Sequence, residues 1–119
     1  CVFGCGGDRD QGKRPLMGEV SKKLSDLSVV TSDNPRREDP EKIVADIMTA
    51  FQSDSTPAEG GLPSVVSEVD REKAIKLACF QAKPGDVILI AGKGHENYQI
   101  IGDKKRDFDD FKLLSHYLR

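Results

Sequence analysis

A run of five apolar residues, Val87 to Ala91, constrains the fold of this chain more than any other feature of its sequence. The run is unbroken rather than alternating, which is typical of a central strand in a parallel sheet whose two faces are both covered. Parallel strands need long crossover connections, and these are most often helices. The run therefore predicts a fold in which strands and helices alternate.

Further apolar segments recur along the chain at the spacing that such a fold requires. Strands are expected at residues 2–5, 27–31, 62–68 and 98–101. An antiparallel edge position is one option for the last of them. The segment from Ser53 to Gly61 is expected to be a loop, because Ser, Asp, Thr, Pro and Gly replace the apolar pattern there.

Helical patterns separate these strands. Helices are expected over residues 13–26, after the N-cap residues Asp39 and Asp70, and at the end of the chain. The first helix has an apolar stripe of Leu16, Met17, Val20 and Leu24, and the last has one of Phe108, Phe111, Leu114 and Leu118. The predicted fold class is α/β, with a Rossmann-like, mostly parallel sheet flanked by helices.

The size and charge of the chain exclude several classes of protein. With 119 residues it has the size of one domain, and no apolar run approaches the length of a membrane span. A formal net charge of −2 gives no basic field that would gather nucleic acid. The three cysteines have no paired spacing, which indicates free thiols in a reducing compartment. We therefore expect a cytoplasmic monomer with neither nucleic-acid nor membrane partners.

The glycine-rich residues 4–13 follow the first predicted strand and can be compared with two phosphate-binding patterns. The dinucleotide pattern GxGxxG fails because Arg9 stands at its third glycine. The P-loop pattern is nearly met by Gly7, Gly12 and Lys13. However, Arg14 replaces the hydroxyl residue that would hold magnesium. A stand-alone nucleotide-binding or P-loop-like module is one alternative function, and a solvated glycine turn is the plain structural reading.

Two further loops place charged side chains after predicted strands. Asp33-Asn34-Pro35-Arg36 offers a guanidinium that can bind a carboxylate through two parallel hydrogen bonds. Gly92-Lys93-Gly94-His95-Glu96 offers a flexible backbone and a carboxylate that can bind an ammonium group. With Arg9, these loops complement an amino-acid end that carries both charges. A non-enzymatic module that binds peptide ends is a second alternative, and each loop alone is equally well explained as a turn.

Four segments of the chain, taken in order, resemble one family. They are residues 3–10, 12–15, 31–36 and 92–99. Together they resemble the carboxy-terminal domain of the Mur ligase family, and the resemblance extends from the first residue to the terminal helix. The Asp-Asn-Pro-Arg segment looks like the form found in members that add meso-diaminopimelate rather than lysine. The resemblance implies that residues 1–119 are one carboxy-terminal, amino-acid-binding domain that lacks its first strand and helix.

The resemblance also implies an activity and a set of contacts. Members use ATP to phosphorylate a carboxylate of a UDP-linked muramoyl dipeptide, and the incoming amine then attacks the acyl phosphate. Residues expected to contact the far end of meso-diaminopimelate are Arg9, Asn34, Arg36, Gly92 and Glu96. Residues expected on the nucleotide side are Asp8 and, as a weaker assignment, Lys13.

The remaining machinery of the reaction is expected elsewhere in a longer protein. The resemblance implies a central domain with a P-loop, magnesium ligands and a carbamylated lysine, so ATP and magnesium would bind mainly outside this chain. No catalytic residue and no metal ligand is assigned to the chain, and the role of His95 stays open. The chain alone is therefore expected to be inactive as a ligase.

Overall fold

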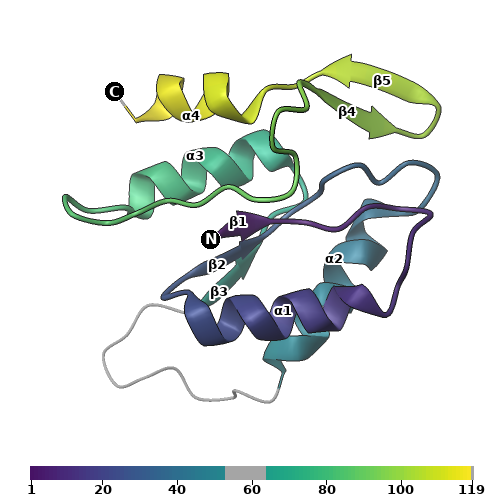
Figure 1. Cartoon of the computed structure of the whole chain (residues 1–119), viewed down its shortest axis with the longest axis horizontal. Helices are drawn as coiled ribbons and strands as arrows, with labels where there is room; N and C mark the ends of the chain where they lie inside the picture. The colour runs from purple at the N-terminus through teal and green to yellow at the C-terminus, as the bar shows by residue number, and fades with distance from the viewer. Residues whose placement is uncertain (53–63, 119) are drawn as a thin grey trace.

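Three short parallel strands form the sheet at the centre of the molecule (Figure 1). They are β1 (Val2–Phe3), β2 (Ser28–Val30) and β3 (Val65–Ser67), in the spatial order β1-β2-β3. The computed structural model describes residues 1–52 and 64–118. The loop predicted from Ser53 to Gly61, and the first two residues of the predicted strand 62–68, lie outside the described residues.

The apolar residues 87–91 do lie beside β1, but not as the covered central strand that their sequence predicts. The backbone N of Val2 donates to Leu89 O at 2.8 Å, and Val2 O accepts from Ala91 N at 2.9 Å, which is a short parallel pairing. The segment is the edge of the sheet, and Val87 and Leu89 are 91% and 59% exposed. The prediction is wrong in this respect because no described element covers the outer side of this edge.

This pairing creates a reversal of strand order beside β1. The chain runs from β1 to β2 to β3 and then returns, through a helix, to pair residues 89–91 with the opposite side of β1. In open α/β sheets, the loops on either side of such a reversal separate to opposite faces and leave a crevice at the carboxyl ends of the strands. The fold therefore directs attention to the loops that follow β1, β2 and residue 91.

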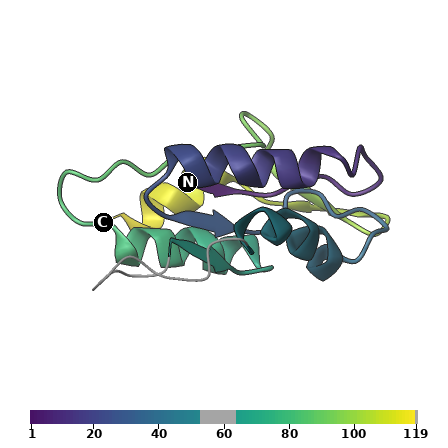
Figure 2. The same ribbon diagram turned by 90° about the horizontal axis from the view of Figure 1, so that it is seen from below.

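The described helices cover both faces of the sheet, one pair below the strands in Figure 1 and the other pair above them; Figure 2 is the view from below. On one face lie α1 (Lys13–Leu24) and α2 (Pro40–Met48), the latter extended by the 3-10 turn η1 (Thr49–Phe51). On the other lie α3 (Arg71–Gln81) and α4 (Asp110–Tyr117). None of the described helices is long and apolar enough to cross a membrane.

The helix starts follow the sequence signals closely. The Asp39 carboxylate accepts a hydrogen bond from Glu41 N, and the Asp70 carboxylate accepts one from Lys73 N. Both predicted N-caps are therefore confirmed. Pro40 occupies the first position of α2, where a missing N–H costs nothing because that group has no partner within a helix.

The core is divided by the sheet into two apolar clusters. Neighbouring strand residues point to opposite faces, so Phe3 and Val30 pack toward α2, whereas Val2 and Val29 pack toward α3. The first cluster is completed by Cys5, Ile43, Val44, Ile47, Ala50 and Phe51, and the second by Ala74, Ile75, Ala78 and Phe108. The Rossmann-like α/β class is confirmed by this arrangement.

Most of the apolar stripe of α1 does not face either cluster, and only Met17 reaches Cys5. Leu16 and Leu24 are 65% and 83% exposed, and the buried face of the helix consists instead of Arg14, Gly18 and Ser21. A Cβ on Gly18 would lie 2.7 Å from Ile47 O, so α1 approaches the α2 backbone through its smallest residue. The helix is confirmed, but the stripe that predicted it is left uncovered by the described residues.

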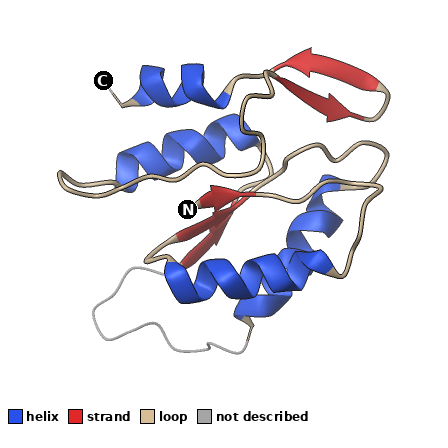
Figure 3. Cartoon of the chain, in the orientation of Figure 1, coloured by secondary structure: helices blue, strands red, loops and turns tan. Residues whose placement is uncertain are grey.

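The segment after residue 97 forms a separate two-stranded antiparallel sheet (Figure 3). Its strands are β4 (Tyr98–Ile101), which the sequence predicts, and β5 (Lys104–Asp107), which it does not. β4 therefore pairs with β5 and is not an edge strand of the main sheet. β5 escaped prediction because its four residues are charged and exposed, and so carry no apolar alternation.

The terminal helix is confirmed, but its predicted stripe is not the buried face. α4 begins after Phe108, which is buried but lies outside the helix, and Phe111 is exposed. The side chains that pack against the α3 side of the core are Leu113 and Tyr117. The predicted stripe is off by one residue, because its spacing starts at Phe108, which precedes the helix.

The three cysteines are free, as the sequence predicts. Cys5 is buried with its Sγ 3.4 Å from Met17 Sδ, whereas Cys1 and Cys79 are half-buried. Burial raises the pKa of the Cys5 and Cys79 thiols. Both therefore favour the protonated, unreactive form.

Candidate functional site at the carboxyl edge of the sheet

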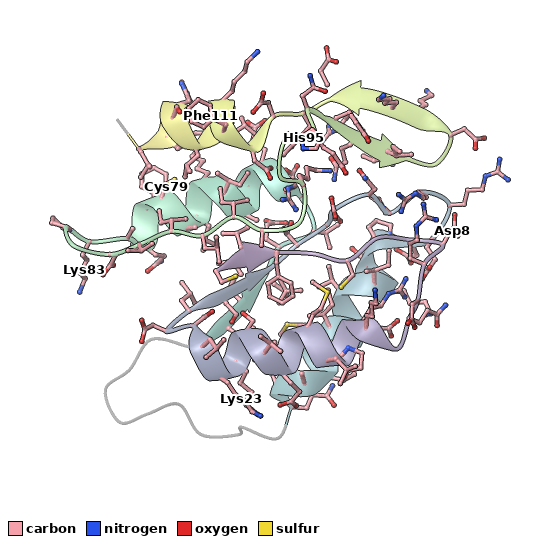
Figure 4. All side chains as sticks on the ribbon, viewed as in Figure 1. Asp8, Lys23, Cys79, Lys83, His95 and Phe111 are labelled. Carbon is pink, nitrogen blue, oxygen red and sulfur yellow. The ribbon has the colours of Figure 1, made fainter. Side chains whose placement is uncertain are left out.

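Three loops meet at the carboxyl edge of the parallel strands. They are residues 4–12 after β1, residues 31–39 after β2, and residues 91–97 after the edge segment. Figure 4 shows Asp8 at the outer end of the first loop and His95 close to the start of β4. The carboxyl edge, where the strand order predicts a ligand site, is therefore bordered by loops that all carry charged side chains.

The first two loops are in direct backbone contact. Gly7 N donates to Asn34 O at 2.8 Å, and a Cβ on Gly7 would lie only 1.7 Å from Pro35 O. The next amide, Asp8 N, donates to Glu38 Oε1 at 3.0 Å. Gly7 thus allows the first two loops to come into contact. The N–H groups of Gly7 and Asp8 both donate to acceptors within the chain. A P-loop uses such groups to bind phosphates instead.

A buried arginine holds the first loop to α2. Arg14 is fully buried, and its guanidinium binds both oxygens of Glu38 at 2.8 Å and Asp46 Oδ2 at 2.9 Å. It also donates to Gly6 O at 3.3 Å. The hydrogen bonds from Arg14, followed by that from Asp8 N, lower the pKa of Glu38 to about 2. Arg14 therefore has a structural role, which explains why no hydroxyl residue stands at this position.

The second and third loops are joined through Asn34. Its Oδ1 accepts from Lys93 Nζ at 3.0 Å and from Ile100 N at 2.9 Å, and its Nδ2 lies 3.4 Å from Glu96 Oε1. Lys93 Nζ is also 2.9 Å from Asp33 Oδ1. Residues that are about sixty positions apart in the sequence are thus brought into one polar cluster.

Arg36 connects the same cluster to the first loop. Its Nη1 donates to Gly7 O at 2.9 Å and is 3.4 Å from Asn34 O, while its backbone N donates to Ile100 O at 3.0 Å. Its backbone has φ 54, a region that non-glycine residues seldom occupy. Nε and Nη2 of Arg36 have no hydrogen-bond partner among the described residues.

Gly92 and Arg9, the other residues predicted to contact the amino acid, lie close to Asp33 and Arg36. Gly92 has φ 112, and a Cβ there would contact Asp33 Oδ2 at 3.4 Å. A Cβ on Gly6 would lie 2.9 Å from Arg36 Nη1 and 3.4 Å from Arg9 Cγ, so the two arginines flank the same glycine. The structure thus brings Arg9, Asn34, Arg36, Gly92 and Glu96 to one region.

The two residues predicted on the nucleotide side lie at the margin. Asp8 is exposed, has φ 54, and accepts from Arg37 N at 3.4 Å. Lys13 is the first residue of α1 and is exposed, and no described contact joins it to the other predicted residues. Within residues 1–52 and 64–118, His, Cys, Asp and Glu side chains form no group that could hold a metal ion.

Three polar residues that support the loops were not predicted to do so. Gln99 Nε2 donates to Asp33 O at 2.8 Å, and Lys93 joins two loops as described. Arg71 is fully buried, is paired with Asp110 at 2.7 Å, and donates to Ser32 O at 2.9 Å. For Arg71 the signal was present, because it shares its helical face with Ala74, Ile75 and Ala78, all of them buried.

Comparison with known proteins identifies the family. The family model described as "Mur ligase, glutamate ligase domain" matches residues 1–94. The chain belongs to the Mur ligase family. The resemblance carried by the four sequence segments is therefore confirmed.

Individual Mur ligases match nearly the whole chain. It is 52% identical over 118 residues to "UDP-N-acetylmuramoyl-L-alanyl-D-glutamate--2,6-diaminopimelate ligase 1" of Clostridium acetobutylicum, covering 99% of the chain and 23% of that relative. Ligases with the same name, without the final number, are 56% identical in Synechocystis sp. and 51% identical in Syntrophomonas wolfei. These matches cover 92% and 100% of the chain, and 20% and 23% of the relatives. The chain thus spans less than a quarter of the Mur ligases that it matches.

A solved structure agrees with these matches. A "UDP-N-acetylmuramoyl-L-alanyl-D-glutamate--2, 6-diaminopimelate ligase" superimposes with a TM-score of 0.83 at 44% identity. The superposition covers 98% of the chain and 23% of that protein. The Mur ligase fold therefore extends over the region that contains the three loops.

Proposed function

We propose that the chain is the carboxy-terminal domain of a ligase that uses ATP to join meso-diaminopimelate to a UDP-linked muramoyl dipeptide in peptidoglycan synthesis. The names of the matching relatives, which state a 2,6-diaminopimelate ligase activity, support this proposal. Because the chain spans only 20–23% of these relatives, the activity is proposed for the full-length protein. The isolated chain is expected to have no ligase turnover.

The observation that carries the proposal is the meeting of Arg36, Asn34 and Glu96 at one edge of the sheet. In the proposed complex, the free Nε and Nη2 of Arg36 bind the distal carboxylate of the amino acid through two hydrogen bonds. Glu96 accepts hydrogen bonds from the distal ammonium group. Asn34 Nδ2 lies next to the Glu96 carboxylate and is a further hydrogen-bond donor. Arg9 lies on the same side of Gly6 as Arg36 and adds positive charge there. Gly92 leaves room for the ligand backbone.

The chemical contribution proposed for these residues is alignment. Binding the far end of meso-diaminopimelate positions its near amine against a carboxylate that the rest of the protein activates. Holding two reactants in a reactive geometry can lower a barrier by several kcal/mol. The chain itself is assigned no acid, base or nucleophile.

ATP and magnesium are proposed to bind mainly outside this chain. The amides of Gly7 and Asp8 are used internally, and the described residues hold no metal-binding cluster. Asp8 and Lys13 stay proposed residues of the nucleotide side. The same observations weigh against a stand-alone nucleotide-binding module, since its loop would need those amides for phosphates.

The domain is proposed to contain one more strand and helix, encoded upstream. The exposed stripe of α1 and the open edge at residues 87–91 border a shallow apolar groove of about 360 Å³. An added strand beside Leu89 and a helix over Leu16 and Val20 would cover this surface. The surface supports the proposal because exposed apolar stripes on one face of a helix mark a packing partner.

The proposal is tested by replacing Glu96 with Gln in the full-length enzyme. This change keeps the shape of the side chain and removes the charge that would hold the distal ammonium. The KM for meso-diaminopimelate should rise about tenfold or more, as expected for a lost charge-assisted hydrogen bond, while the KM for ATP stays within about twofold. Asp26→Asn is the matched control, because Asp26 is an exposed carboxylate just before β2, at the opposite end of the strands from the three loops.

An unchanged KM for meso-diaminopimelate in Glu96→Gln would contradict the proposed binding mode. A second measurement separates the alternatives, namely equilibrium binding of ATP to the isolated chain. The ligase proposal predicts weak or no binding. Tight binding of ATP by the chain alone would favour a nucleotide-binding module instead.

A further inference from the structure

Lys93 has a buried ammonium group that links two loops of the candidate site. Its side chain is fully buried, with Nζ 2.9 Å from Asp33 Oδ1 and 3.0 Å from Asn34 Oδ1. Lys93 belongs to the loop after the edge segment, whereas both partners belong to the loop after β2. Burying a charge is costly unless it is paired and hydrogen-bonded, so these contacts hold the two loops at one spacing.

The contact also determines how the Asn34 carboxamide is oriented. Oδ1 accepts from both Lys93 Nζ and Ile100 N, so Nδ2 points to the opposite side, toward Glu96. A flipped amide would direct its NH2 group at two donors and would lose both hydrogen bonds. Lys93 is thus one of two groups that keep the Asn34 donor directed at Glu96.

We propose that Lys93 is a positioning residue for amino-acid recognition. It sets the orientation of Asn34 and the separation of Asn34 and Glu96, and touches no substrate itself. This inference rests on the proposed function, since it concerns the same site. Lys93 acts through Asn34. Its loss should therefore weaken binding of the amino acid and leave the amide-forming step itself unchanged.

The bases of the two loops are joined independently of Lys93. Arg71 donates to Ser32 O at 2.9 Å and to Ala91 O at 3.3 Å, and its ion pair with Asp110 ties α3 to α4. Ser32 and Ala91 directly precede the loop segments that carry the site. Removing Lys93 should therefore loosen the tips of the loops while their bases remain attached.

The test uses the full-length enzyme with Lys93→Met, which keeps a similar volume and removes the charge. The KM for meso-diaminopimelate should rise about tenfold or more, and the KM for ATP should stay within about twofold. A merely structural role would lower the amount of folded enzyme and hence the apparent kcat, but would leave both KM values unchanged. Lys112→Met, which changes an exposed lysine of α4, is the matched control and should leave both constants unchanged.

A double variant separates positioning from stability. Lys93→Met leaves the Asp33 carboxylate without its ion-pair partner, so it should lower the Tm. Lys93→Met with Asp33→Asn removes both charges and should restore much of the Tm without restoring the KM for meso-diaminopimelate. The positioning role is refuted if the double variant restores the KM for meso-diaminopimelate together with the Tm. It is also refuted if Lys93→Met alone does not raise this KM.

The outcome can be told apart from a failure of the proposed function. If Glu96→Gln raises the KM for meso-diaminopimelate and Lys93→Met does not, only the role of Lys93 is wrong. If neither variant changes this KM, the assignment of amino-acid binding to these loops is wrong as well. In an Asn34→Ala background, Lys93→Met should have little further effect on the KM, because the group through which it acts is gone.

Discussion

Arg14, Arg71 and Lys93 are three fully buried cations, and each has a carboxylate partner that belongs to another segment. Arg14 holds the first loop to α2, Arg71 holds the bases of the second and third loops, and Lys93 joins their tips. Removing one partner of a buried pair leaves an uncompensated charge, so such pairs are sensitive points of a structure. The three loops are therefore held in place by buried charges that are paired within the chain.

Gly7 is expected to tolerate no larger residue. A Cβ there would lie 1.7 Å from Pro35 O, so Gly7→Ala should force the first two loops apart and destabilise the fold by about 1–3 kcal/mol. Urea unfolding followed by circular dichroism measures the change. Gly12→Ala is the control, because Gly12 already has helical φ and ψ and meets only the Asp10 side chain. Equal stability of the two variants would contradict the close-approach argument.

The pairing of Glu38 predicts a loss of stability in acid. Hydrogen bonds from Arg14 and then from Asp8 N lower the folded-state pKa of Glu38 from 4.5 to about 2. A lowered pKa stabilises the fold above the unfolded value, and this contribution disappears as the pH falls from about 4.5 to about 2. The free energy of unfolding of Glu38→Gln should therefore depend less on pH than that of the unmutated chain over this interval. Parallel pH dependences from urea unfolding would contradict the role of the pair.

The sequence predicts the positions of loops and helix starts better than it predicts which faces of the strands and helices are exposed. Glycine, proline and N-cap signals depend on local backbone geometry, so the helix starts at Asp39 and Asp70 were located correctly. Exposure depends on which elements pack together. The run from Val87 to Ala91 reads as a covered strand, yet in the described chain it is an open edge.

The candidate site was predictable in part for the same reason. Arg36 and Glu96 stand in loops with strong local signals, and the order of parallel strands brings such loops to one edge. Lys93 and Arg71 were not identified as supporting residues, because a cation in a sequence does not reveal which distant carboxylate pairs with it. Only the helical spacing that places Arg71 on the same face as Ala74 and Ala78 indicates that Arg71 points inward.

Arg71 and Asp110 are predicted to couple α3 to α4. Arg71→Met leaves the largely buried Asp110 carboxylate unpaired and should destabilise the fold by about 3–5 kcal/mol. Adding Asp110→Asn should recover part of this loss, because the double variant contains no uncompensated charge. A double-mutant cycle measured by urea unfolding gives the coupling energy. Additive effects of the two substitutions would show that the pair does not connect the helices.

At the scale of the whole molecule, the exposed stripe of α1 marks the surface where the rest of the protein is proposed to pack. Val20→Ser should change the stability of the isolated chain by no more than about 0.5 kcal/mol, because Val20 is exposed there. In the full-length protein the same substitution should cost about 1–3 kcal/mol, as expected for a buried apolar side chain.

Thermal unfolding of the chain and of the full-length protein measures this difference. Lys23→Ser is the control, because Lys23 is an exposed residue of α1 that does not line the apolar groove. It should have a small effect in both contexts. A small effect of Val20→Ser in the full-length protein as well would mean that this surface stays uncovered.

Recognition of the far end of an amino acid by the loops around Arg36 is tested by the kinetics of Arg36→Lys in the full-length enzyme. A lysine keeps the positive charge but cannot reproduce the two parallel hydrogen bonds of a guanidinium to a carboxylate. The variant should lose about 1.5–3 kcal/mol of transition-state stabilisation, which is roughly ten- to a hundredfold in kcat/KM for meso-diaminopimelate, with the KM for ATP nearly unchanged. Unchanged kcat/KM for meso-diaminopimelate in this variant would mean that these loops do not bind the far end of the amino acid.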